Sequence, residues 1–293
     1  MKRLVHAELF KLRTTNAWWL FALAILASTV TMLVVNGINA YSLLQPFNSF
    51  VNLHSHGHAG SIPADFLAHL RQEWTAGHDG IGQAAMLYTS GQLIGVLLVC
   101  LLGIVMVTSE FYQQTATFTF LQTPRRSAVI RGKLVAALLV AGLAWLVSTV
   151  ISVAAGAAFL HSQGYSTGLG HWAVDRAILL NLAAYLLWTL FGIGFGCLVR
   201  HQLAATVSAT VLYLIGATAA ATVFELLNTY VLNQNWVLAA QVVVPPVAST
   251  VMVSATQAFE QSPPAWVGAV VLLVWSLVAI RLGDRRLQRH DIT

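Results

Sequence analysis

Hydrophobic and polar residues alternate in long blocks along this chain. Six blocks are almost wholly apolar and about 20 residues long, the length that a helix needs to cross the hydrocarbon core of a bilayer. None of the six shows the period-two alternation of strands in a membrane β-barrel. The pattern therefore predicts one domain over 1–293, an all-α polytopic membrane protein with six transmembrane helices. These predicted spans are 17–39, 84–108, 134–160, 177–199, 203–226 and 265–283.

The basic residues predict the topology of these spans. When the N-terminus is placed inside, thirteen of the fifteen Lys and Arg residues fall on the inner side, and only Arg71 and Arg176 fall outside. The positive-inside rule then predicts cytoplasmic N- and C-termini, in agreement with an even number of spans. The inner set is Lys2, Arg3, Lys11, Arg13, Arg125, Arg126, Arg131, Lys133, Arg200, Arg281, Arg285, Arg286 and Arg289.

Composition supports the membrane class. The chain is 57% hydrophobic and only 9% charged, with a mean hydropathy of +0.73, whereas soluble domains carry about 25% charged residues. Its basic excess reflects topology, so we expect no nucleic-acid partner. Cys100 and Cys197 both lie in apolar blocks, where cysteine more often packs than forms a disulfide or binds a metal.

Two outer segments differ in character. Residues 40–83 form a His-rich external loop in this prediction, and residues 227–264 contain no Lys or Arg. The second segment holds an apolar run that Pro245 and Pro246 interrupt. Because proline breaks a helix, a re-entrant pair of short helices and an ordinary interfacial loop are both compatible with it.

Two segments predicted to lie on the inner side have helical patterns in addition to the basic residues that indicate topology. In residues 1–16, Val5, Leu9 and Leu12 recur at helical spacing, which predicts an amphipathic helix in the membrane interface in contact with lipids. Residues 109–133 are longer than antiparallel spans need. They combine an aromatic edge with a Thr-Pro pair at 123–124, which is typical of a helix start. This segment suits a cytoplasmic partner, although an elbow that binds only lipid headgroups would share the pattern.

The chain carries no recognisable catalytic motif. It lacks the P-loop, H-E-x-x-H and G-x-S-x-G patterns, and no Asp, Glu or Lys lies in the middle of a predicted span. We therefore expect no enzyme activity and no cofactor in this chain. The glycines of GIGFG, 192–196, lie within a span and favour close helix packing over phosphate binding. We predict no metal site, and the weaker metal candidates are the alternating His54, His56 and His58.

Two short sequences carry a family resemblance. AELFKLRTT followed by WW near the N-terminus, and SEF…T…FLQTPRR…RGK after the second span, resemble the membrane subunit of a type-2 ABC transporter, an exporter permease common in actinobacteria. The resemblance implies a bacterial cytoplasmic membrane location and a second permease subunit, in a homodimer or heterodimer. It also implies separate cytoplasmic ABC ATPase subunits, which would hold the ATP and Mg.

The resemblance further implies a coupling helix over 109–123 that contacts the ATPase. Relatives commonly show a basic residue and a glycine where this chain has Tyr112, Gln113 and Gln114, so these three positions are candidates for partner specificity. The coupling residues implied are Glu110, Phe111, Tyr112, Gln113, Gln114, Thr115, Phe118, Pro124, Arg125 and Arg126.

The resemblance implies ATP-driven export by alternating access. The uncharged spans favour a hydrophobic or amphipathic substrate, such as a lipid, a drug or a lipopeptide. Two alternatives stay open from the sequence. One is a metal-linked permease that uses the external histidines, and the other is a membrane scaffold or sensor that transports nothing.

Overall fold

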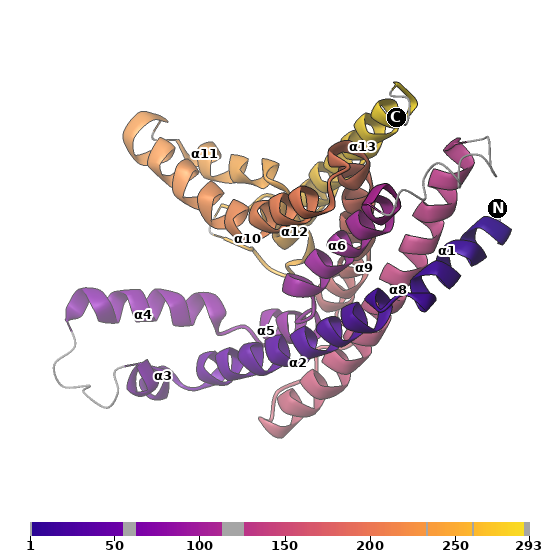
Figure 1. The fold of residues 1–293 in the computed structure, drawn as a ribbon. Helices are drawn as coiled ribbons and strands as arrows, with labels where there is room; N and C mark the ends of the chain where they lie inside the picture. The colour runs from indigo at the N-terminus through magenta and orange to yellow at the C-terminus, as the bar shows by residue number, and fades with distance from the viewer. Residues whose placement is uncertain (1, 55–62, 113–125, 233, 260, 290–293) are drawn as a thin grey trace.

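The computed structural model describes residues 2–54, 63–112, 126–232, 234–259 and 261–289, and all regular structure in these ranges is helical. Figure 1 shows the arrangement of the helices. They are α1 (Lys2–Thr14), α2 (Ala17–Leu44), α3 (Phe47–His54), α4 (Ala64–Gly77), α5 (Gly80–Tyr88), α6 (Gln92–Tyr112), α8 (Arg126–Ser162), α9 (Trp172–Val199), α10 (Gln202–Leu227), α11 (Asn235–Ala240), α12 (Pro245–Val253) and α13 (Ala265–Arg289), with a π-helical turn at Asn228–Leu232 and a 3₁₀ turn at Gln241–Val243.

Six of the described helical segments are long and apolar enough to cross a membrane. Each predicted span lies within or largely overlaps one of them, so the prediction of an all-α chain with six such helices is confirmed for the described residues. The second segment consists of α5 and α6, which are separated by a short break at Thr89–Gly91. The Tyr185 hydroxyl donates a 2.8 Å hydrogen bond to the Gly91 carbonyl at this break, in addition to the bond that this carbonyl accepts from the Gly95 amide.

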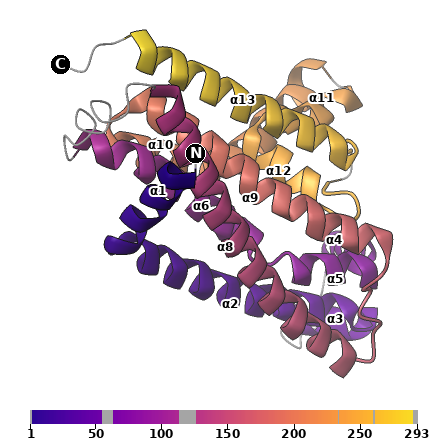
Figure 2. The ribbon, with the colours of Figure 1, turned by 90° about the vertical axis from the view of Figure 1, so that its right-hand side faces the viewer.

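Helix α9 forms the centre of the bundle, between α6 and α13 (Figure 2). Its glycines bring the backbones together. A Cβ on Gly192 would overlap the Cys100 carbonyl of α6, and a Cβ on Gly194 would overlap the backbone of Ala279 in α13. Residues two apart face opposite sides of a helix, so one short glycine motif serves both neighbours. The packing role predicted for GIGFG is confirmed.

The proline-interrupted run forms two short helices rather than a surface loop. Helix α11 with its 3₁₀ turn meets α12 at a bend of 104°, and nearly every residue of α12 is buried. Helix α12 packs against α9, α10 and α13. The Trp275 indole donates a 2.9 Å hydrogen bond to the Val243 carbonyl at the bend. Protein thus covers the α12 side of the break, where Pro245 and Pro246 are buried, although Val243 itself is 54% exposed; irregular backbone is tolerated at membrane depth where protein buries it.

The described part of 40–83 differs from the predicted loop. It contains α3 and α4, which project together from the rest of the molecule in Figure 1. Phe50 and Leu70 form a small buried cluster with Leu43 at the end of α2. The Trp74 indole donates a 2.9 Å hydrogen bond to the Gln45 carbonyl. The few apolar residues of these two helices pack against one another, and this contact could not be predicted from either segment alone.

The glycine contacts generate a stability prediction with a built-in control. Gly194→Ala is expected to lower the free energy of unfolding by about 1–3 kcal/mol, the usual cost of overpacking, because the obstructing atoms belong to backbone. Gly142→Ala in α8, where nothing lies within 4 Å of the added carbon, is expected to stabilise by about 0.5–1 kcal/mol through helix propensity. Thermal unfolding of both variants in the same detergent measures the difference, and equal melting temperatures would contradict the packing.

Candidate functional site

Helices α1, α6 and α8 come together at the end of the bundle nearest the N-terminus (Figure 2). Four charged side chains of these helices form ion pairs there. Glu8 and Lys11 come from α1, Glu110 from the last turn of α6, and Lys133 from the first turns of α8. We call these four residues the charge cluster. Side-chain exposure is 6% for Lys133, 9% for Glu8 and 11% for Glu110, whereas Lys11 remains 49% exposed.

Apolar packing carries α1 to this position. Val5, Leu9 and Leu12, the stripe predicted to face lipid, pack instead against a protein cluster that includes Met106 of α6 and Ala136 of α8. Glu8 precedes Leu9 in the chain, so the same docking places its carboxylate at the helix junction. Lys11 lies at i+3 from Glu8, a spacing at which helical side chains meet.

The charges alternate around the cluster. Lys133 Nζ lies 2.8 Å from Glu8 Oε2 and 2.8 Å from Glu110 Oε1. Lys11 Nζ lies 2.8 Å from Glu110 Oε1 and 3.1 Å from Glu8 Oε1. Lys133 also donates a 3.3 Å hydrogen bond to the Met106 carbonyl. An ammonium has three protons to donate, so every donor of Lys133 has an acceptor.

Charge balance makes the burial of these groups tolerable. A buried charge without a partner is costly, but here two carboxylates face two ammonium groups. Burial alone would lower the pKa of Lys11, but the hydrogen bond and charge of Glu110, together with Glu8, raise it above its ordinary value of 10.5. The stabilising contribution of Lys11 is therefore fully present below pH 10.5 and is lost as the pH rises through the raised pKa.

The charge cluster lies beside the predicted coupling segment. Of the ten predicted coupling residues, Glu110 belongs to the cluster, and Tyr112 ends α6 with 80% of its surface exposed. Phe111 is part of α6, and Arg126 begins α8. The other six, Gln113, Gln114, Thr115, Phe118, Pro124 and Arg125, lie outside the described residues, as do the Thr-Pro pair and most of the predicted helix.

Sequence reasoning missed three members of the cluster. Lys11 and Lys133 entered only as topology signals, and Glu8 only as a letter in the N-terminal motif. One signal was available, because acidic residues are rare in this chain, and Glu110 closely follows a predicted span while Glu8 lies in the amphipathic segment before the first span. Their pairing depends on how α1 folds back, which no local pattern specifies.

The metal candidates do not form a described site. His54 Nδ1 lies 2.9 Å from the Phe50 carbonyl in its own helix, while His56 and His58 lie outside the described residues. The described residues contain no cluster of three His, Cys, Asp or Glu side chains that is suited to a metal. Cys100 and Cys197 are buried and free.

Comparison with known proteins places this chain in no family. No protein-family model matches it, and no curated protein matches it in sequence.

The geometry predicts that neutralising one charge of the cluster lowers stability more than neutralising two opposite charges together. Lys133→Met leaves two buried carboxylates with one exposed lysine, and breaking a buried pair costs about 3–5 kcal/mol. Lys133→Met combined with Glu110→Gln restores charge balance and is expected to recover a large part of this loss. Lys2→Met removes an exposed cation of α1 that is not part of the charge cluster and is the control. Thermal unfolding in detergent gives the stabilities, and limited proteolysis reports release of α1.

Equal stability of Lys133→Met and Lys2→Met would contradict the structural role of the cluster. So would a double variant that is no more stable than Lys133→Met alone.

Proposed function

We propose that this chain is the permease subunit of an ATP-driven transporter of the type-2 ABC exporter class. It would work as one of two permease subunits in a bacterial cytoplasmic membrane and move a hydrophobic or amphipathic substrate by alternating access. ATP hydrolysis would take place on separate cytoplasmic subunits. The resemblance of the two inner segments supports this proposal, and one structural observation carries it: the charge cluster joins the two helices that flank residues 113–125.

The cluster makes those two helix ends one mechanical unit. Lys133 of α8 pairs with Glu110 of α6, and both are tied to α1 through Glu8 and Lys11. Ion pairs gain strength away from water, so these contacts resist separation. A partner that pushes on the connection between α6 and α8 would displace both helices together with α1, and the load would be shared by all three.

Close backbone contacts offer a route from this unit to the centre of the bundle. A Cβ on Gly103 of α6 would lie 2.9 Å from the Thr189 carbonyl of α9. Gly194 continues the same kind of contact from α9 to α13. Backbones in direct contact have no flexible side chains between them to absorb a displacement. Alternating access additionally requires that ATP favours one arrangement through different contacts with the partner in the two states.

The interior polar groups fit an uncharged pathway. Thr29 of α2 and Ser148 of α8 share a 2.9 Å hydrogen bond, and the Gln92 amide of α6 donates to the Ser249 carbonyl of α12. These groups are polar but neutral, whereas the described ion pairs lie at the end of the bundle. A neutral interior favours hydrophobic or amphipathic cargo over a charged solute, which would need compensating charges.

Tyr112→Asp tests the coupling surface without disturbing the cluster. Tyr112 is 80% exposed, and Tyr230, at the opposite end of the bundle, is equally exposed, so Tyr230→Asp is a matched control. Both variants are expected to insert and fold normally. Only Tyr112→Asp is expected to weaken copurification with the ABC ATPase subunit proposed as its partner, by about 2 kcal/mol or more, as for a tyrosine hot spot, and to abolish transport-linked ATP hydrolysis.

Charge reversal at Glu110 would be a poorer test, because it would place a third cation against Lys11 and Lys133 and unfold the junction. Equal behaviour of the two tyrosine variants would contradict a contact at Tyr112. Copurification of a signalling kinase in place of an ATPase would contradict the transporter proposal altogether.

A further inference from the structure

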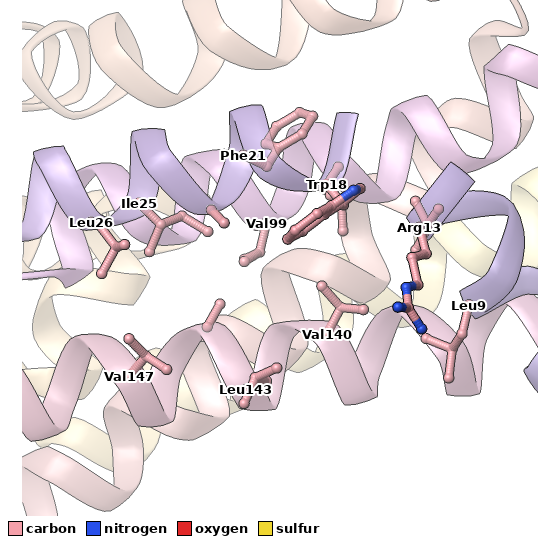
Figure 3. Close-up of a pocket in the computed structure, with 14 residues that line it drawn as sticks. Leu9, Arg13, Trp18, Phe21, Ile25, Leu26, Val99, Val140, Leu143 and Val147 are labelled. Atoms are coloured by element: carbon pink, nitrogen blue, oxygen red, sulfur yellow. The ribbon is translucent and has the colours of Figure 1, made fainter. Parts of the chain in front are cut away.

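An apolar groove of about 450 Å³ runs between α1, α2, α6 and α8 (Figure 3). This volume lies within the range of about 300–1,000 Å³ for sites that hold small ligands. Thirteen of the fourteen residues that line it are hydrophobic, and the exception is Arg13. The groove is distinct from the charge cluster, none of whose members lines it.

The groove has a polar end and an apolar end. Arg13 and Trp18 lie where α1 turns into α2, whereas Leu26 and Val147 lie farther along α2 and α8 (Figure 3). Trp18 and Leu26 are eight residues apart, which corresponds to about 12 Å along a helix. If the polar end lies at the membrane surface, as the basic residues near it predict, the groove reaches less than half way across a hydrocarbon core of about 30 Å.

Arg13 brings an uncompensated positive charge to the polar end. Its side chain is exposed, and it extends between α1 and α8 beside Leu9 in Figure 3. Lys11, two residues earlier, pairs with both carboxylates of the charge cluster. Over the part of the chain that the structure describes, Arg13 has no ion pair or hydrogen bond through its side chain. An anion at this position would meet a free guanidinium, which binds phosphate through paired hydrogen bonds.

The surroundings favour a lipid as the source of that anion. Helix α2 forms one wall of the groove, and its outer face is strongly apolar and exposed, with Leu23 58% and Val30 50% exposed. Such a face is suited to lipid. Tryptophan is enriched at the level of lipid headgroups, which is the level that Trp18 would occupy. Basic pockets between membrane helices on the cytoplasmic side are known to accept acidic headgroups.

We propose that this groove binds an anionic phospholipid of the inner leaflet, with one acyl chain between α2 and α8 and the phosphate held by Arg13. The bound chain would fill the space between α1 and the spans. It would extend the contact of α1 with α2 and α8 beyond that made by the charge cluster. The site requires neither the ATPase nor transport, so it stands independently of the proposed function.

The test uses the full chain alone, in phosphatidylcholine nanodiscs that contain a small fraction of phosphatidylglycerol with a photoreactive acyl chain. Cross-links mapped by mass spectrometry are expected on groove residues of α2 and α8. Arg13→Gln is expected to reduce this labelling about fivefold, the factor that corresponds to ~1 kcal/mol for one cation at an anionic membrane surface. Arg3→Gln, an exposed cation on the same helix that does not line the groove, is expected to change nothing.

A second pair of variants tests the acyl-chain half of the site. Leu143→Trp fills the groove and is expected to abolish the cross-links. Leu139→Trp makes the same change one turn away on α8, where the side chain is 55% exposed and does not line the groove, and is expected to retain them.

Equal labelling by photoreactive phosphatidylcholine would overturn the proposal, since it would show ordinary bilayer contact. Equal labelling of Arg13→Gln and Arg3→Gln would also overturn it, and this comparison holds even if Leu143→Trp does not fold. An equal loss of labelling in Leu139→Trp and Leu143→Trp would likewise contradict binding in the groove.

Discussion

The ion pairs of Lys133 with Glu8 and Glu110 are the interaction on which the junction of α1, α6 and α8 depends. Three helices that enter the junction from different parts of the chain each supply a charge that the others require. Removing any one leaves a buried charge without compensation, so α1, α6 and α8 are held in a single arrangement. The apolar groove is lined by residues of the same three helices together with α2, so its shape depends on this arrangement.

The rest of the bundle is held together by shape more than by hydrophobicity. Between helices in lipid, apolar burial supplies little drive, because lipid tails are as apolar as leucine, and close packing at small residues takes its place. Gly103 of α6, Gly192 and Gly194 of α9 and Gly268 of α13 meet neighbouring backbones directly. The ion pairs and the glycine contacts therefore hold different parts of the bundle: the first hold α1, α6 and α8 together, and the second hold α6 and α13 against α9.

The spans could be predicted from the sequence because the bilayer imposes a simple rule of length and hydropathy. The packing role of GIGFG could be predicted because glycine in a span has few other uses. The helices α3 and α4 could not be predicted in the same way. Their apolar residues are few, and they form a buried cluster only when the two helices meet each other and Leu43. The interior position of α12 was also hidden, because an apolar run around Pro245 and Pro246 is compatible with several depths until its neighbours are known.

For the candidate site, the sequence by itself determined the composition of the parts: an amphipathic N-terminal helix, an acidic residue at the end of the second span and a lysine before the third. It also determined the asymmetry of basic residues, since charge is a property of each residue alone. Only the tertiary structure decided that the apolar stripe of α1 faces protein and that Glu8 and Lys11 reach Glu110 and Lys133. It also placed Arg13 beside a groove, where no described residue forms an ion pair with it. The physical reason is that ion pairing and cavities depend on distances of a few ångströms between segments about a hundred residues apart, and the chain sets these distances only when the helices pack.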